Sequence, residues 1–243
     1  MNMSQEEFLK VFNDLEQTLQ NKYDTTETIY DLLEREKNAV ENNPTKANWE
    51  ILDIARRLRN ILAHETRTTL PVVATPSQQI IDVLKKVTHD YQHPKTLGDF
   101  LAEGEREKIL SFQLQDQLTE VLKAIHEKHF NQFPVFDEAG YAGLISNNGI
   151  ASWLAALSEQ GRSAGLDLTG VRISEILPFE ENGDTVIRLS KDTSLFETLH
   201  HFTGSKVRLV LVCQSKDLSI QRPADIAGII TKSDLGQMVK ELR

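Results

Sequence analysis

The sequence has few of the residues that would indicate a secreted, membrane-spanning or metal-dependent protein. Its 243 residues include one cysteine, Cys213, so no disulfide can form within the chain and a cytoplasmic protein is expected. Charges interrupt Met1–Gln20 throughout, so neither a signal peptide nor a membrane span is expected there. No Cys/His cluster has metal-site spacing, and neither a Ser-His-Asp set nor a Walker-type phosphate loop is visible.

Basic residues are also fewer than acidic residues. The chain carries 27 basic against 36 acidic residues, a formal net charge of −9. Nucleic acids and anionic membranes attract proteins of opposite sign, so a general binder of either is not expected. The length leaves room for two domains that each bury a core.

Glycine is absent from Ser4–Thr69 and strand-type patterning is scarce there, which predicts an all-helical domain over residues 1–92. Apolar residues recur at helical spacing in four stretches. These stretches run from Phe8 to Leu19, Ile29 to Val40, Trp49 to Leu62, and Ile80 to Val87. The pattern Asp24-Thr-Thr-Glu27 is expected to open the second helix, and Pro76 the fourth.

Residues 93–243 contain an internal repeat. Three pairs of positions share an offset of 76: Thr96 and Arg172, Asp116 and Asp192, and Phe133 and Leu209. Gly143 and Gly228 lie 85 apart, so the second copy carries an insertion, which is placed in the polar segment Gln214–Asp225. The copies span about residues 96–160 and 171–243, and the repeat indicates a duplicated supersecondary unit.

The apolar pattern of each copy predicts the order β-α-β-β-α. Asp116 and Asp192 are expected to be the N-caps of the first helix in their respective copies. The expected fold class is therefore α+β. An N-terminal all-α bundle is followed by two β-α-β-β-α repeats packed as a pair.

A strand-turn-helix motif occurs once in each copy, as Gly143-Leu-Ile-Ser-Asn-Asn-Gly149 and Gly228-Ile-Ile-Thr-Lys-Ser-Asp234. In the second, the hydroxyl of Thr231 and the carboxylate of Asp234 stand three positions apart at the start of a helix. A carboxylate there can accept hydrogen bonds from both hydroxyls of a ribose, and the helix N-terminus favours a phosphate. The structural alternative is an ordinary helix cap.

These motifs, together with Phe133-Pro-Val-Phe-Asp-Glu-Ala-Gly140, resemble those of CBS domains, the modules named after cystathionine β-synthase. The resemblance covers about Thr96–Leu242. It implies a head-to-tail pair without catalytic activity that binds an adenosine-containing regulatory ligand, with AMP, ADP or ATP the nucleotides expected and no metal required. It also implies a homodimer, because CBS pairs commonly self-associate.

The resemblance assigns different residues to the two copies. In the second it assigns ribose binding to Thr231 and Asp234, and base contacts to Ile229, Ile230, Val207 and Leu209. Sequence proximity adds phosphate contacts from Arg208, Lys232 and Arg222. In the first copy Ser146 matches the hydroxyl, but Gly149 stands where the carboxylate is expected. A weak or empty site is predicted there, with an apolar base slot formed by Phe133, Pro134 and Val135.

The third predicted helix contains Arg56-Arg-Leu-Arg59-Asn60-Ile-Leu-Ala-His64, which resembles the Arg-x4-His motif of HEPN domains. In ribonucleases of that family, which act without a metal, the histidine transfers protons and the arginine stabilises the phosphate. Arg59, Asn60 and His64 are therefore candidate catalytic residues. The alternative is a charged helix exposed to solvent. The net charge of −4 over Met1–Thr75 is unfavourable for binding RNA.

Three functions remain open from the sequence, and with them the question of whether the chain is an enzyme. The first is a nucleotide sensor whose CBS pair controls a helical effector or dimerisation domain. The second is a nucleotide-gated ribonuclease acting on RNA. The third is an interaction scaffold without a ligand.

Overall fold

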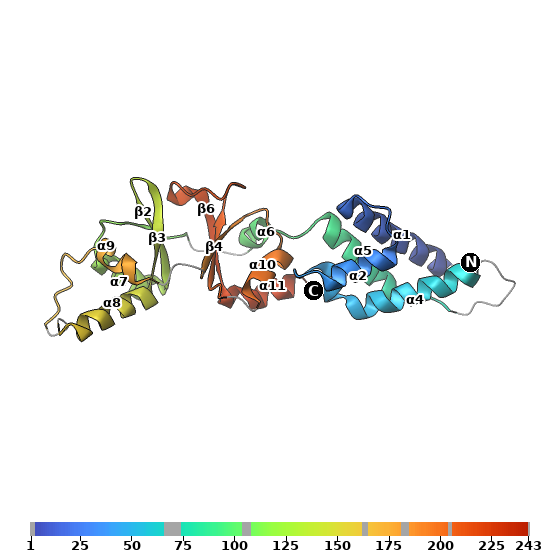
Figure 1. Cartoon of the computed structure of the whole chain (residues 1–243), viewed down its shortest axis with the longest axis horizontal. Helices are drawn as coiled ribbons and strands as arrows, with labels where there is room; N and C mark the ends of the chain where they lie inside the picture. The colour runs from blue at the N-terminus through green and yellow to red at the C-terminus, as the bar shows by residue number, and fades with distance from the viewer. Residues whose placement is uncertain are drawn as a thin grey trace. The chain divides into compact units, whose positions relative to one another are not determined.

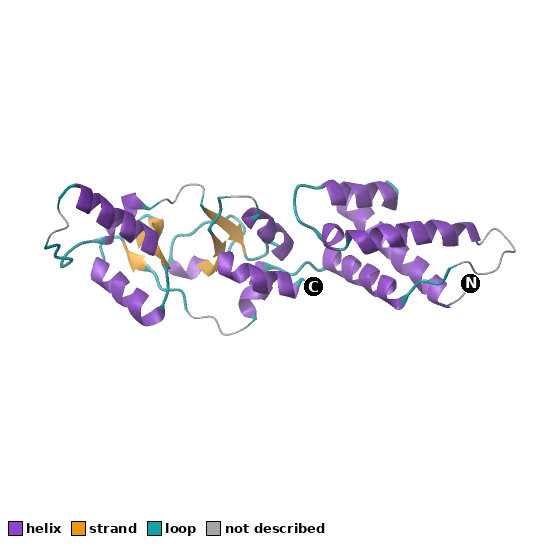
Figure 2. Ribbon diagram, turned by 90° about the horizontal axis from the view of Figure 1, so that it is seen from below, coloured by secondary structure: helices purple, strands orange, loops and turns teal. Residues whose placement is uncertain are grey.

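The computed structural model describes residues 3–65, 74–103, 108–161, 165–180, 185–203 and 206–242. As the sequence predicts, the protein is α+β, with a helical N-terminal part followed by two three-stranded sheets (Figures 1 and 2). The chain forms two compact units. The first comprises Met1–Lys95 with Ser194–His200 and Leu242, and the second Thr96–Thr193 and His201–Glu241 with Arg243. No helix among the described residues has the length and apolar character that a membrane span requires.

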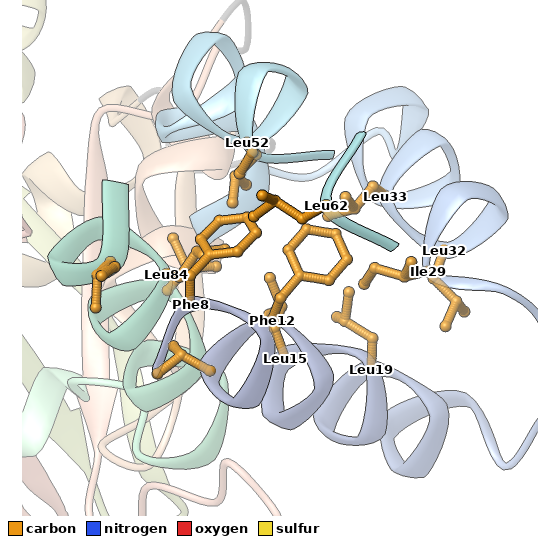
Figure 3. Close-up of a cluster of buried hydrophobic side chains, with 14 residues drawn as sticks. Phe8, Phe12, Leu15, Leu19, Ile29, Leu32, Leu33, Leu52, Leu62 and Leu84 are labelled. Atoms are coloured by element: carbon orange, nitrogen blue, oxygen red, sulfur yellow. The ribbon is translucent and has the colours of Figure 1, made fainter. Parts of the chain in front are cut away.

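The first unit contains five helices among its described residues below position 95. They are α1 (Met3–Tyr23), α2 (Ile29–Asn38), α3 (Pro44–Ala47), α4 (Trp49–Glu65) and α5 (Gln78–Gln92). The predicted apolar stripe of α1 is fully buried, and α1 packs against α2 and α5. Figure 3 shows Phe8 and Phe12 of α1 directed toward Leu52 and Leu62 of α4 and Leu84 of α5. The helices therefore share one core.

Two of the predicted helix starts lie too early. The second helix begins at Ile29 rather than within Asp24–Glu27, because the hydroxyl of Thr28 accepts the backbone N–H of Asp31. Asp24 has a φ of 49° and belongs to the turn that follows α1. Helix α5 is likewise capped by Ser77, so Pro76 precedes the cap rather than occupying the first turn.

The second unit contains both repeats. The first repeat comprises α6 (Leu97–Ala102), β1 (Phe112–Gln113), α7 (Leu118–Lys128), β2 (Gln132–Asp137), β3 (Gly140–Ser146) and α8 (Asn147–Glu159). The second comprises α9 (Ile173–Ile176), η1 (Leu177–Phe179), β4 (Val186–Ser190), α10 (Leu195–Phe202), β5 (Leu209–Cys213), η2 (Pro223–Asp225), β6 (Ile226–Thr231), η3 (Lys232–Asp234) and α11 (Leu235–Glu241). Part of α10 is assigned to the first unit.

The two sheets have the same topology. In each, the first strand runs parallel to the second and the second pairs antiparallel with the third, in the orders β1-β2-β3 and β4-β5-β6. The loop between β5 and β6 spans residues 214–225, where the insertion was predicted. The predicted N-caps lie one and two positions too early, because Gln117 precedes α7 and Ser194 precedes α10. Asp116 instead accepts the N–H of Gln113, and α7 begins at Leu118.

Both faces of the first sheet are buried. On one face, Phe133, Val135 and Ile145 join the core formed with α7, α8 and α9. On the other, Phe136 and Leu144 pack with strand residues of the second sheet. Figures 1 and 2 show the first sheet between those helices and the second sheet. Alternation of side chains along a strand accounts for this division, since neighbouring residues point to opposite faces.

The opening segment of each repeat packs on the other repeat. At the start of the second repeat, Ile173 and Ile176 of α9 enter the core of the first repeat, and Leu177 of η1 covers Gly143 of β3. At the start of the first repeat, Leu101 of α6 covers Gly228 of β6. This exchange of opening segments ties the repeats together and brings the end of η1 to the first repeat.

Candidate functional site

A cleft of about 640 Å³ lies between the repeats of the second unit. Its lining comes from the start of β2, the end of β3, the first turns of α8, the end of η1 with the residue after it, and the starts of β4 and β5. The lining residues are Asn131, Gln132, Leu144, Ser146, Asn147, Asn148, Gly149, Ala151, Ser152, Phe179, Glu180, Thr185, Val186, Arg208 and Leu209. Polar side chains and backbone therefore dominate, with a few apolar surfaces.

Ser146 is placed by the junction of β3 and α8. It ends the strand with extended backbone, and its hydroxyl caps the helix by accepting the N–H of Gly149 at 3.2 Å. The same serine donates twice to Glu180: its backbone N–H lies 2.5 Å from Oε1 and its hydroxyl 2.8 Å from Oε2. A serine and a carboxylate that are 34 positions apart thus meet in the cleft.

Glu180 was not among the predicted site residues. It follows η1, which Leu177 anchors against β3, and its side chain is half-buried. Burial raises the pKa of its carboxyl group above the ordinary value, and the two hydrogen bonds from Ser146 oppose that rise. The pattern around Ser146 could not indicate this residue, because only the fold brings position 180 to position 146.

The cleft holds two charged residues among its described lining, Glu180 and Arg208. Arg208 stands just before β5, where its backbone N–H donates to the carbonyl of Thr185, and its side chain is exposed. Phe179 also lines the cleft and keeps 36% of its surface exposed. The site therefore combines hydroxyl, carboxylate, guanidinium and aromatic groups within one hollow.

Thr231 and Asp234 form the corresponding turn of the second repeat. Oδ2 of Asp234 accepts the backbone N–H of Thr231 at 2.8 Å and its hydroxyl at 3.0 Å. The hydroxyl of Thr231 also lies 2.6 Å from that of Ser233. The predicted pair thus makes a reciprocal capping arrangement, and these residues do not line the cleft described above.

The other predicted nucleotide contacts are divided between the cleft and the core. Arg208 and Leu209 line the cleft, whereas Lys232 is exposed outside it. The remaining predicted apolar contacts do not line it: Phe133, Pro134, Val135, Val207 and Ile230 are buried, and Ile229 is partly buried. Arg222 pairs instead with Asp225, its Nε lying 3.3 Å from Oδ1.

The predicted catalytic residues lie on α4 in the first unit. Arg59 is half-buried and Asn60 is exposed, but the side chain of His64 lies outside the described residues. Arg56, on the same helix, forms ion pairs with Asp53 and Glu34. The ribonuclease hypothesis stays a prediction. No group of three or more potential metal-binding His, Cys, Asp or Glu side chains occurs in the described part of the chain.

Comparison with known proteins gives structural matches only. No protein-family model matches the sequence, and no curated protein matches it. Among solved structures, the CBS-domain containing protein ATU1752 from Agrobacterium tumefaciens is 19% identical, with a TM-score of 0.42 over 61% of this chain and 96% of that one.

Two further matches are structures with bound ligands. CBSX2 in complex with AMP is 18% identical, with a TM-score of 0.41 over 61% of this chain and 98% of that one. The CBS domain pair of MJ0100, in complex with 5-methylthioadenosine and S-adenosyl-L-methionine, is 18% identical, with a TM-score of 0.42 over 62% and 99%. At such low similarity, the function of this chain is inferred from its own residues.

Proposed function

We propose that this chain is a regulatory protein that binds an adenine nucleotide between the two repeats of its second unit. The observation that carries the proposal is the cleft in which Ser146, Glu180, Phe179 and Arg208 converge. Its volume of about 640 Å³ suits a ligand of nucleotide size. The residues that resemble CBS motifs favour adenosine among the nucleosides.

Each part of a nucleotide has a matching group in the cleft. The carboxylate beside Ser146 can accept hydrogen bonds from sugar hydroxyls. Arg208 offers a guanidinium to phosphate oxygens, and Phe179 offers an exposed ring on which a base can stack. These three groups come from three separate segments, so a ligand that contacts all of them binds best when the segments hold one arrangement.

Isothermal titration calorimetry of the full chain with AMP, ADP, ATP and GTP tests the proposal. We expect adenine nucleotides to bind. Arg208→Gln should weaken ATP binding about tenfold, because the variant loses one charge-assisted hydrogen bond to a phosphate. Adenosine should be affected less by the same change. The matched control is Arg222→Gln, since Arg222 pairs with Asp225 and does not line the cleft. Absence of binding by every adenine nucleotide would remove the proposal and favour the scaffold.

The regulatory part of the proposal is that nucleotide binding in the second unit changes the first unit or its self-association. Such coupling requires the ligand to bind two arrangements of the chain with different affinity. Hydrogen–deuterium exchange of the full chain with and without ATP should then change the protection of α1–α5 as well as of the cleft. Analytical ultracentrifugation under the same two conditions tests the proposed homodimer. Changes confined to the cleft and an unaltered sedimentation profile would exclude this coupling.

A further inference from the structure

We propose that Glu180 is the ribose-binding carboxylate of the first repeat, supplied by the opening segment of the second repeat in place of the side chain that Gly149 lacks. This inference rests on the proposed nucleotide-binding function and reverses the sequence-based expectation of a weak or empty first site.

The space beside Gly149 is occupied by Glu180. A β-carbon added to Gly149 would overlap the carboxylate of Glu180, with its Cγ at 2.8 Å. The carboxylate therefore fills the position where the side chain of a larger residue 149 would begin. Glycine at position 149 leaves room for this close approach of the Glu180 side chain, which is one of the roles that favour this residue.

The two repeats use the same pair of donors. In the second, Asp234 accepts from the backbone N–H and the hydroxyl of Thr231. In the first, Glu180 accepts from the backbone N–H and the hydroxyl of Ser146. A side chain at the third helical position normally completes such a capping box. The structure completes it with a residue 34 positions away.

Glu180 retains the capacity to bind more donors. An ionised carboxylate offers about four lone-pair sites, and Ser146 occupies two of them. Because Glu180 also lines the cleft, the remaining sites are available to the two hydroxyls of a ribose. A vicinal diol is therefore the ligand group that matches this carboxylate.

The same carboxylate sets the direction in which a nucleotide binds. The N-terminus of α8 would otherwise attract a phosphate, but Glu180 already places a negative charge there. A phosphate beside it would be repelled. The phosphates are therefore expected near Arg208, the one cation among the described lining residues, and the sugar near Ser146.

This arrangement makes the ligand a bridge between separate parts of the chain. Ser146 belongs to the first repeat, whereas Glu180 belongs to the opening segment of the second. A bound diol would favour the state in which that segment is docked, and the ligand would thereby stabilise one arrangement of the repeats.

The experiment uses the full chain with Asp234→Ala, so that binding reports the first repeat alone. AMP and its 2′,3′-dideoxy analogue are titrated into this protein and into the same protein carrying Glu180→Gln. Glutamine can still accept the N–H of Ser146, but it lacks the second acceptor oxygen. We expect the dideoxy analogue to bind about tenfold more weakly than AMP, and Glu180→Gln to weaken AMP binding by a similar factor while removing the difference between the two ligands.

A second variant tests whether a carboxylate at position 149 can replace that of Glu180. Gly149→Asp combined with Glu180→Ala should restore AMP binding and the preference for AMP over its dideoxy analogue, whereas Glu180→Ala alone should lose both. Circular dichroism confirms that each variant is folded.

Three outcomes would overturn the inference. Unchanged affinity and unchanged preference in Glu180→Gln would mean a purely structural cap. Tighter AMP binding in Glu180→Ala would mean that Glu180 blocks the cleft. Binding by the wild type that disappears with Asp234→Ala would place the nucleotide at the second repeat and outside this cleft, which would keep nucleotide binding as the function but overturn its proposed location. Absence of binding by the wild type would instead remove the proposed function itself.

Discussion

The side chain of Leu101 lies directly over Gly228, although the two residues belong to different repeats. A β-carbon added to Gly228 would lie 2.5 Å from both Cδ atoms of Leu101. The reciprocal contact, Leu177 over Gly143, is looser, with a shortest distance of 3.1 Å. The glycine of each strand-turn-helix motif therefore serves packing between repeats, and the second one leaves no room for a methyl group.

Gly228→Ala should lower the free energy of unfolding of the second unit by about 1–3 kcal/mol, because Leu101 must move to accommodate the methyl group. Unfolding in urea is followed by the fluorescence of Trp153 in a Trp49→Phe background, since these are the two tryptophans of the chain. Gly236→Ala is the control, as a β-carbon there meets nothing within 4 Å. Equal stability of the two variants would contradict the packing argument.

Glu180 should make the stability of the second unit depend on pH. Burial raises the pKa of its carboxyl group above the ordinary value of 4.5, so the native state holds the proton more strongly than the unfolded state. The free energy of unfolding therefore falls as pH rises from below 4.5 through the raised pKa. Relative to Glu180→Gln, the wild type should lose stability over that interval.

Ser146→Ala tests the cause of this shift. The variant removes the hydroxyl bond that opposes the effect of burial, so the pH interval should move upward. Urea unfolding at a series of pH values measures both effects. A wild type that instead gains stability with rising pH, relative to Glu180→Gln, would show that the bonds from Ser146 outweigh burial.

Glu36 should be a stabilising residue of the first unit. It is 1% exposed and accepts hydrogen bonds from Lys22 at 2.5 Å and from the hydroxyl of Tyr23 at 2.7 Å. Glu36→Gln should cost about 1–3 kcal/mol, because the buried site loses a charged acceptor. Trp49 fluorescence in a Trp153→Phe background reports this unit. Glu41→Gln is the exposed control, expected within about 0.5 kcal/mol of the wild type.

Cys213 provides an independent measure of opening in the second unit. Its side chain is fully buried in β5, and burial raises the pKa of its thiol. The native protein should therefore react slowly with Ellman's reagent, and urea should make the reaction fast. Gly228→Ala should accelerate the native reaction, by about tenfold for each 1.4 kcal/mol of lost stability if the opening is global. A fast reaction in the native wild type would contradict the buried position of this thiol.

Much of the fold could be predicted because its signals are local. The apolar stripe from Phe8 to Leu19 has helical spacing, and it is buried as expected. The repeated offset between the copies predicted two β-α-β-β-α units and the insertion within 214–225, and both are present. Helix starts were less accurate, since several neighbouring polar residues can cap a helix and packing selects among them.

The candidate site was predicted only in part, for a related reason. Spacing within one turn indicated Ser146, and it paired Thr231 with Asp234, because hydrogen bonds within a turn depend on nearby positions. The burial of Phe133 and Val135 away from the cleft depends on which face of β2 meets α7 and α8. That choice is made by the packing of the whole repeat.

The amino-acid sequence by itself determined the duplicated architecture and the hydroxyl at Ser146, because periodicity and capping act over a few residues. Only the tertiary structure decided which carboxylate meets that hydroxyl. Glu180 reaches it because the opening segment of the second repeat packs on the first repeat. This contact joins positions far apart in the sequence and is driven by burial of apolar surface, so the spacing of neighbouring residues does not indicate it.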